Sequence, residues 1–190
     1  QPGVHWASNS LAVLAAADAM GADLEKAAAD LATIPALRGR GAVDVIPWGE
    51  GTIRLIDDSY NANPESMSAA LKTLGHIQPE GGRRVAIIGD MLELGDTSRT
   101  AHAELKDHIE KNDVDTVYLA GTEMNALAEV LDSDRVAATA ETAEALLPAV
   151  LSGLRTGDVI TVKASNGTGL GRIVAALTNP ETSARATNGD

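Results

Sequence analysis

The stretch Arg83–Asp90, RRVAIIGD, places four apolar residues and a glycine between two arginines and an aspartate. A short, continuous apolar run of this kind predicts a strand that is buried on both faces. Three similar runs follow it, and the stretches between them are long enough for helices: VDTVYLAG (114–121), DRVAAT (134–139) and DVITVKAS (158–165). This alternation predicts an α/β domain with helices layered on a mostly parallel sheet.

The residues before this run predict a hairpin and a helical segment. VDVIPWGEGTIRLIDD (43–58) indicates two short strands joined by a turn at GEG, and NSLAVLAAADAMGADLEKAAADLATI (9–34) indicates two helices broken at Gly21, with Asp23 as a cap. PALRGRGAV (35–43) is typical of a hinge, so we place a boundary near Arg40. The predicted parts are a helical segment (1–39), the α/β domain (40–178) and a disordered tail (179–190).

Composition excludes several classes of protein. A chain of 190 residues with 44% hydrophobic content can bury one sizeable core, and it holds no apolar run long enough to span a membrane. The absence of cysteine excludes disulfides and suits a reducing compartment, so a cytoplasmic location is expected. A net charge of -12 and few aromatic residues argue against nucleic acid as a partner. Because the chain does not begin with Met, we expect it to be a piece of a longer protein.

The strand end DDSYNANP (57–64) carries polar side chains at the edge where open parallel sheets bind ligands. Asn63 before Pro64 fits the N-cap of a following helix, and we favour this capping role over direct ligand contact. Asp57 and Asp58 point to opposite faces of a strand, so one is expected to find a partner while the other faces the crevice. A solvated surface pair is the alternative.

Two further strand-end loops carry similar chemistry. GDMLELGDTS (89–98) holds three carboxylates, and its Asp96 or Thr97 could cap the next helix. VKASNGTGLG (162–171) has closely spaced glycines, but its spacing is not GxGxxG. No lysine follows a glycine, so the chain contains no P-loop. His5, His76, His102 and His108 lack metal-ligand spacing, so solvated or helix-surface roles and no metal site are expected.

DDSYNANPESM (57–67), RRVAIIGDMLELGDTSRTAH (83–102) and VKASNGTGLGRIV (162–174), in this order, resemble the C-terminal part of the Mur ligase family. The spelling Tyr60-Asn61-Ala62-Asn63-Pro64 resembles the branch of the family that adds D-alanyl-D-alanine. The resemblance runs from about Gly3 to about Leu177 and is looser at GVHWASNSLAVLAAA (3–17). It implies a three-layer Rossmann-like domain preceded by a short helical segment.

The resemblance also implies an ATP-dependent amide ligation in peptidoglycan synthesis, and with it a part in cell shape and cell division. In this family the γ-phosphate of ATP moves to the terminal carboxylate of UDP-N-acetylmuramoyl-tripeptide, and the amine of D-alanyl-D-alanine attacks the acyl phosphate. The P-loop and the Mg²⁺ ligands belong to a central domain that this chain almost entirely lacks. The chain alone is therefore expected to hold no catalytic residue and to be an inactive monomer.

Two sets of site residues follow from the resemblance. The residues expected to contact ATP are Arg40, Asp58, Tyr60, Asn61 and Asn63. The residues expected to line the pocket for the incoming amine are Asp90, Met91, Glu93, Leu94, Lys163, Ser165 and Asn166. Lys163 could hold the carboxylate of the dipeptide or could instead pair with Asp90 or Glu93, and Arg40 could simply be a solvated hinge residue. The alternative function is a non-catalytic module of the same fold that binds a nucleotide or a peptide.

Overall fold

The structure, a computed structural model, describes residues 4–33 and 38–182. The chain divides into two compact units, Gln1–Leu37 and Arg38–Asp190. The second unit starts at Arg38, whereas the predicted domain starts at Arg40. Of the predicted hinge, residues 35–37 lie outside the described part, and so do residues 183–190 of the predicted tail. Before them, the Glu181 N–H donates to Asn179 Oδ1 at 3.0 Å.

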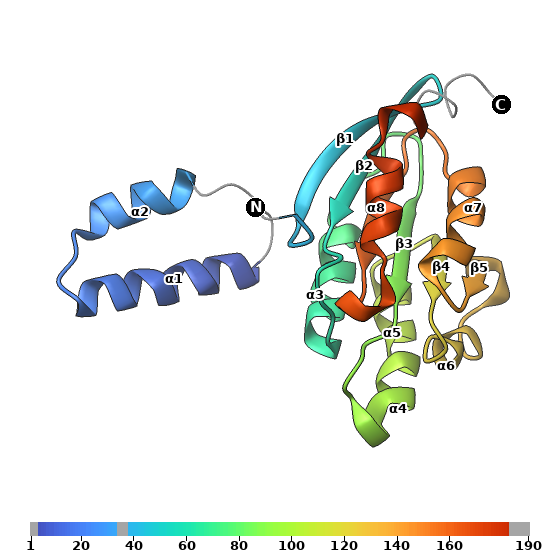
Figure 1. The fold of residues 1–190 in the computed structure, drawn as a ribbon, viewed down its shortest axis with the longest axis horizontal. Helices are drawn as coiled ribbons and strands as arrows, with labels where there is room; N and C mark the ends of the chain where they lie inside the picture. The colour runs from blue at the N-terminus through green and yellow to red at the C-terminus, as the bar shows by residue number, and fades with distance from the viewer. Residues whose placement is uncertain (1–3, 34–37, 183–190) are drawn as a thin grey trace. The chain divides into compact units, whose positions relative to one another are not determined.

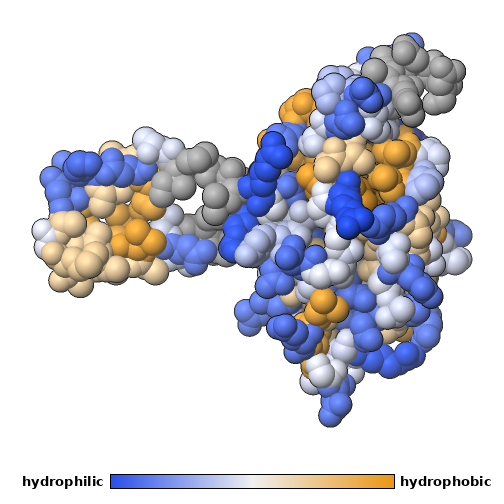
Figure 2. Space-filling model, viewed as in Figure 1, coloured by the Kyte–Doolittle hydropathy of each residue, from blue (hydrophilic) through white to orange (hydrophobic). Residues whose placement is uncertain are grey.

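The first unit is a pair of helices, α1 (Val4–Ala19) and α2 (Leu24–Thr33). The break between them is at Gly21, whose φ of +74° suits a residue without a Cβ. The Asp23 carboxylate accepts a hydrogen bond from the Lys26 N–H at 3.0 Å, as expected for a cap. Leu11 and Met20 are 68% and 81% exposed, and Figure 2 shows hydrophobic residues on the surface of these helices. The pair therefore buries little of its own apolar surface.

The second unit is built on one six-stranded sheet (Figure 1). Its strands are β1 (Ala42–Trp48), β2 (Gly51–Asp57), β3 (Arg84–Gly89), β4 (Thr116–Ala120), β5 (Val136–Ala140) and β6 (Val159–Lys163). Their order across the sheet is β1-β2-β6-β3-β4-β5, and only β1 runs antiparallel to its neighbour. The predicted α/β class and mostly parallel sheet are confirmed.

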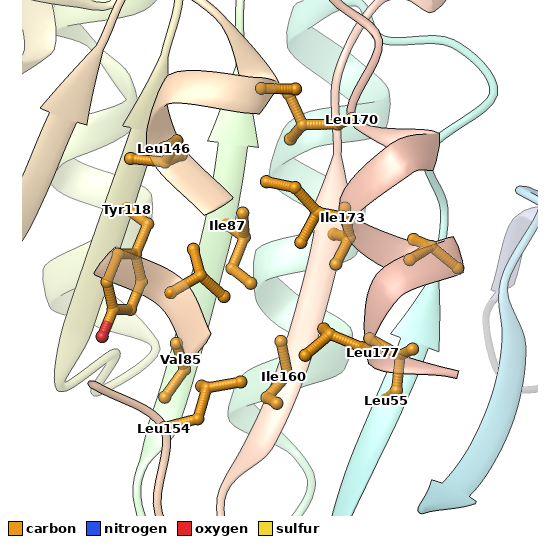
Figure 3. Packing of buried hydrophobic residues seen from close by; sticks show 14 of the residues in the cluster. Leu55, Val85, Ile87, Tyr118, Leu146, Leu154, Ile160, Leu170, Ile173 and Leu177 are labelled. Carbon is orange, nitrogen blue, oxygen red and sulfur yellow. The ribbon is translucent and has the colours of Figure 1, made fainter. Parts of the chain in front are cut away.

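Helices cover both faces of this sheet. They are α3 (Pro64–Gly75), α4 (Ser98–Ala103), α5 (Leu105–Lys111), α6 (Asn125–Ala128), α7 (Ala143–Gly153) and α8 (Gly171–Leu177). Short 3₁₀ turns add η1 (Gly95–Thr97), η2 (Ser133–Arg135) and η3 (Asn166–Thr168). Buried residues of α3, α5 and α6 pack on one face. Those of α7 and α8 pack on the other, where Leu146 and Ile173 lie over Ile87 (Figure 3). The result is the three-layer arrangement expected.

The hairpin at the sheet edge has the predicted two-strand form. Trp48 pairs with Gly51, so Gly49 and Glu50 make the turn, and Gly49 has a φ of +58°. At the start of α3, Asn63 Oδ1 accepts from the Ser66 N–H at 2.8 Å and Ser66 Oγ accepts from the Asn63 N–H at 3.0 Å. This reciprocal capping box is the capping role predicted for Asn63.

An ion pair between Arg83 and Asp158 lies at the edge of the sheet where β3 and β6 begin. The Arg83 guanidinium donates to both carboxylate oxygens of Asp158, at 3.2 and 2.7 Å, and Asp158 is fully buried. This hydrogen bonding is the main reason that the pKa of Arg83 is raised. Burial also raises the pKa of the nearby Tyr118 hydroxyl. The ion pair between Arg83 and Asp158 connects the residue just before β3 to the residue just before β6.

Candidate functional site

Three neighbouring strands end together at the carboxyl edge of the sheet. β6 lies between β2 and β3, with Val162 paired to Asp57 and Lys163 paired to Ile88. The loops that follow these three strands contain all of the predicted site residues except Arg40 and Lys163, which is the last residue of β6. Strand order thus gathers, at one edge, side chains that are about a hundred residues apart in the sequence.

Lys163 is the last residue of β6 and is almost completely buried. Its Nζ donates to Asp58 Oδ2 at 2.7 Å and to the Asn61 backbone oxygen at 2.8 Å. The side chains of Lys163 and Asp58 are 3% and 27% exposed, so this ion pair is only partly screened by solvent. The alternative that Lys163 pairs with Asp90 or Glu93 is wrong in this structure.

Asp57 and Asp58 both have partners. Asp57 is 5% exposed, and its carboxylate accepts from the Gly39 N–H at 2.8 Å and from the Ser59 hydroxyl at 2.6 Å. Asp58 binds Lys163 instead. Asp57 is therefore the carboxylate that is buried with its partners, while the Asp58 side chain is 27% exposed and also has a partner, which was not predicted from the sequence. The reason is that β6 brings a lysine beside β2, which the local sequence does not reveal.

The hydrogen bonds of Asp57 hold the turn that carries Arg40. Gly39 has a φ of +75°, and the Tyr60 N–H donates to its carbonyl at 3.0 Å. A Cβ on Gly39 would come within 3.0 Å of the Tyr60 Cβ, so this close approach requires a glycine. The Arg40 guanidinium carbon lies 4.2 Å from the centre of the Tyr60 ring, a cation–π contact. Both side chains are exposed, so the cation is accessible to a ligand.

Ser165 links its own loop to the loops that follow β2 and β3. Its hydroxyl accepts from the Leu92 N–H at 2.9 Å and donates to the Ala62 carbonyl at 3.4 Å, while its own N–H donates to the Asp90 carbonyl at 3.0 Å. Ser165 is 5% exposed. Asn166, the next residue, is exposed.

Asp90 is buried below the loop that follows β3. Its Oδ1 accepts from the Met124 N–H at 3.0 Å, and Gly121 lies so close that a Cβ there would meet the carboxylate at 2.2 Å. Burial raises the pKa of the Asp90 carboxyl, and hydrogen bonds from the Glu123 and Met124 N–H groups oppose this shift. These contacts give Asp90 a structural role beneath the loop.

His102 is a site residue that sequence reasoning missed. It is fully buried, so the expected solvated or surface role is wrong. Its Nε2 accepts from the Met91 N–H at 2.9 Å, and its Nδ1 lies 2.7 Å from the Ser98 carbonyl. The two partners together require a neutral ring with the proton on Nδ1. The spacing Ser98 to His102 is one helical turn, but the link to Met91 gives no sequence signal.

The loop between β3 and α4 exposes its middle residues. Glu93 has a φ of +66°, which is uncommon for a residue with a side chain, and both Glu93 and Leu92 are exposed. Leu94 is half-buried, and its carbonyl accepts from the Thr97 hydroxyl at 2.8 Å. Thr97 precedes α4, but its side chain makes no capping bond there, and Asp96 lies within η1. The prediction of a side-chain cap at Asp96 or Thr97 is therefore wrong.

The edge brings together an accessible cation at Arg40, a half-buried carboxylate at Asp58 and an exposed carboxylate at Glu93. Within residues 4–33 and 38–182, no three His, Cys, Asp or Glu side chains gather to hold a metal ion. In the same residues, no helix is long and apolar enough to cross a bilayer. The arrangement can accept hydrogen bonds from hydroxyl groups and offer a guanidinium to an anion.

Comparisons with known proteins give relatives over most of the chain. Residues 44–166 match the family described as Mur ligase, glutamate ligase domain. The UDP-N-acetylmuramoyl-tripeptide--D-alanyl-D-alanine ligase of Mycobacterium tuberculosis (strain ATCC 25618 / H37Rv) is 36% identical over 200 residues, covering 95% of this chain and 39% of the relative. The protein of the same name in Bacillus subtilis (strain 168) is 34% identical over 179 residues, covering 92% and 38%. The chain spans about two fifths of the length of these curated relatives.

Solved structures agree in fold. A crystal structure of MurF from Acinetobacter baumannii matches with a TM-score of 0.79 and 29% identity, over 93% of this chain and 38% of that chain. A crystal structure of MurF ligase from Thermotoga maritima in complex with ADP matches with a TM-score of 0.69 and 26% identity, over 90% and 37%.

Proposed function

Because the chain belongs to the Mur ligase family, we propose that it is the C-terminal part of a ligase that uses ATP to join D-alanyl-D-alanine to UDP-N-acetylmuramoyl-tripeptide. The names of the relatives state these substrates for those proteins, and their transfer to this chain is part of the proposal. The proposal places the reaction in the cytoplasm, as a step of peptidoglycan synthesis.

In the proposed reaction the γ-phosphate of ATP is transferred to the terminal carboxylate of the tripeptide, which gives an acyl phosphate and ADP. The amine of D-alanyl-D-alanine then attacks the carbonyl carbon. The new C–N bond forms, the bond to phosphate breaks, and the amine loses a proton. The described residues would bind and orient the two substrates at the carboxyl edge, while the P-loop would come from the rest of the ligase.

The nucleotide loop (residues 58–62) has the groups that a ribose needs. Lys163 occupies Asp58 Oδ2, and none of the hydrogen bonds within residues 4–33 and 38–182 uses Asp58 Oδ1. We assign this oxygen to the ribose hydroxyls, with Tyr60 and Asn61 beside the nucleotide. Arg40, which is exposed and in contact with the Tyr60 ring, would donate to a phosphate of ATP. Asn63 is assigned to the same region, although its side chain caps α3.

The amine loop (residues 90–95) would receive the dipeptide, together with Asn166. Glu93 and Asn166 are exposed and could contact the ammonium group and the amide. Met91, Leu94 and Ser165 would shape the pocket from below. The ligands of Mg²⁺, like the P-loop, are assigned to the rest of the ligase.

The observation that supports the proposal most is that the polar ends of β2, β3 and β6 converge at one edge in a chain of this family. The test is steady-state kinetics of the full-length ligase with Asp58→Ala and Arg40→Ala. Each lost charge-assisted contact is worth about 1.5–3 kcal/mol, so kcat/KM for ATP should fall by about 10- to 150-fold. Glu50→Ala, which removes an exposed carboxylate from the hairpin turn, is the control.

Unchanged KM for ATP and unchanged turnover in both variants would contradict the assignment of Asp58 and Arg40. For the chain of 190 residues alone, we expect weak ATP binding and no hydrolysis, because phosphoryl transfer needs a P-loop and Mg²⁺. Sustained ATP hydrolysis by this chain would contradict that expectation. A full-length protein that binds ATP and dipeptide but never joins the substrates would favour the non-catalytic module.

A further inference from the structure

The segment Lys163–Ser165 contacts the loops on both sides of it. All three of its residues are at least 95% buried, although Lys163 and Ser165 are polar. The segment begins at the last residue of the central strand β6, so the loop after β2 lies on one side and the loop after β3 on the other. Buried polar side chains of this kind are held by their hydrogen bonds, and here these bonds lead to two different loops.

On the side of β2, the segment holds the nucleotide loop at three points. Lys163 Nζ binds Asp58 Oδ2 and the Asn61 carbonyl, at 2.7 and 2.8 Å. Ser165 Oγ lies 3.4 Å from the Ala62 carbonyl, at the end of the same loop. With its ammonium group in these contacts and its side chain 3% exposed, Lys163 is poorly placed to bind a dipeptide carboxylate in this conformation.

On the side of β3, the segment holds the start of the amine loop. The Ser165 hydroxyl accepts from the Leu92 N–H at 2.9 Å, and the Ser165 N–H donates to the Asp90 carbonyl at 3.0 Å. A hydroxyl group can donate one hydrogen bond and accept others at the same time. The Ser165 side chain therefore joins Ala62 of one loop to Leu92 of the other.

We propose that Lys163 and Ser165 are positioning residues that couple nucleotide binding at residues 58–62 to amine binding at residues 90–95. The inference rests on the proposed function of the two loops. A nucleotide that orders Asp58 and its loop also orders the segment that holds the Leu92 N–H, so the amine loop needs less ordering when the dipeptide arrives. Linkage requires that the dipeptide strengthens nucleotide binding by the same factor.

The test measures this factor in the full-length ligase. Calorimetry gives the affinity for the non-hydrolysable analogue AMP-PNP with and without saturating D-alanyl-D-alanine, with saturating UDP-N-acetylmuramoyl-tripeptide present in every titration. We expect the dipeptide to raise the affinity of the wild-type protein by about fivefold or more, within the range usual for coupled sites. The ratio of the AMP-PNP affinity with the dipeptide to that without it measures the coupling. Ser165→Ala removes the hydroxyl bridge, so in this variant the ratio should fall towards one.

Thr168→Ala is the matched control. Its hydroxyl donates to the Ser165 carbonyl at 2.7 Å, so this variant removes a hydroxyl from the same turn without touching either loop. It should keep the wild-type ratio. A wild-type ratio of one, or a ratio that survives in Ser165→Ala, would overturn the inference, because a purely structural Ser165 would lower stability without changing the ratio.

Amide hydrogen exchange of the wild-type protein covers the case in which Ser165→Ala does not fold. AMP-PNP alone should slow exchange at the Leu92 N–H, and unchanged exchange there would also overturn the inference. The proposed function fails separately, if the wild-type protein binds neither substrate or does not ligate them. Ligation with independent binding of the two substrates would remove only the coupling.

Discussion

Thr161 lies in β6, two residues before Lys163, and shows what a buried polar atom costs when it has no partner. The residue is 1% exposed, and its hydroxyl oxygen has no hydrogen-bond partner within the described residues. Desolvation of such a hydroxyl is unfavourable, whereas valine has nearly the same shape. Lys163, on the same face of the strand, avoids this cost through its two bonds.

Thr161→Val should raise the free energy of unfolding by about 1 kcal/mol, because it removes an unsatisfied hydroxyl without opening a cavity. Urea unfolding of the wild type and the variant measures the difference. Thr73→Val is the matched comparison. The Thr73 hydroxyl donates to the Ala69 carbonyl at 2.9 Å, so its removal should not raise the free energy of unfolding. Loss of stability in Thr161→Val would mean that the hydroxyl does have a partner.

Asp90 gives a prediction about pH. Its folded-state pKa is raised, mainly by burial. The carboxyl therefore contributes most to stability below the pKa of the unfolded chain, about 3.9, and this contribution is lost as pH rises through the folded pKa. Asp90→Asn keeps an oxygen for the Met124 N–H and carries no charge. Relative to the wild type, its stability should increase between pH 4 and pH 7.

Guanidinium unfolding at a series of pH values measures this difference. Asp115→Asn provides a comparison, because the exposed Asp115 carboxylate also accepts a backbone N–H, from Arg84 at 2.8 Å. A stability difference for Asp90→Asn that stays constant over the whole pH range would show that the charge of Asp90 is not the cause.

At the scale of elements, the start of α3 separates capping from ligand binding. Asn63→Ala removes the Oδ1 that accepts from Ser66, so it should cost about 1 kcal/mol of unfolding free energy even without nucleotide. Asn61→Ala is the control, since Asn61 holds Lys163 through its backbone carbonyl and its side chain is exposed. Thermal unfolding of both variants measures the difference. If Asn63→Ala were as stable as Asn61→Ala, the capping role of Asn63 would be contradicted.

The elements themselves could be predicted because each has a local cause. Apolar runs predicted β3, β4, β5 and β6, the GEG turn predicted the hairpin, and Asn63-Pro64 predicted the start of α3. Contacts between distant segments could not be predicted. Lys163 meets Asp58 across 105 positions because β6 inserts between β2 and β3, and the insertion of a strand has no local signal. His102 is buried for the same kind of reason.

At the scale of the whole molecule, the hydrophobic core belongs to the second unit. Among the described residues, the buried apolar side chains run from Ile46 to Leu177, while Leu11 and Met20 of the helix pair are exposed. A chain that begins at Arg38 should therefore unfold cooperatively, with a Tm within about 2–4 °C of the longer chain. It should also bind less of a hydrophobic dye. Differential scanning calorimetry and dye fluorescence are the measurements.

A chain that begins at Asp44 is the matched comparison for this truncation. It lacks the Gly39 N–H that donates to Asp57 and the first two residues of β1, so its Tm should be clearly lower. If removal of residues 1–37 alone abolished the cooperative transition, the helix pair would be part of the folding unit.

The turn at Gly39 also determines how the domain would bear a pulling force. The Gly39 and Gly41 N–H groups donate to Asp57, and the Gly39 carbonyl accepts from Tyr60. Tension applied through the chain ahead of Arg38 would load these three bonds first, before it reached the ladder between β1 and β2. The first mechanical event under load would then be the release of Asp57 and Tyr60, which deforms the proposed nucleotide loop while the rest of the sheet stays folded.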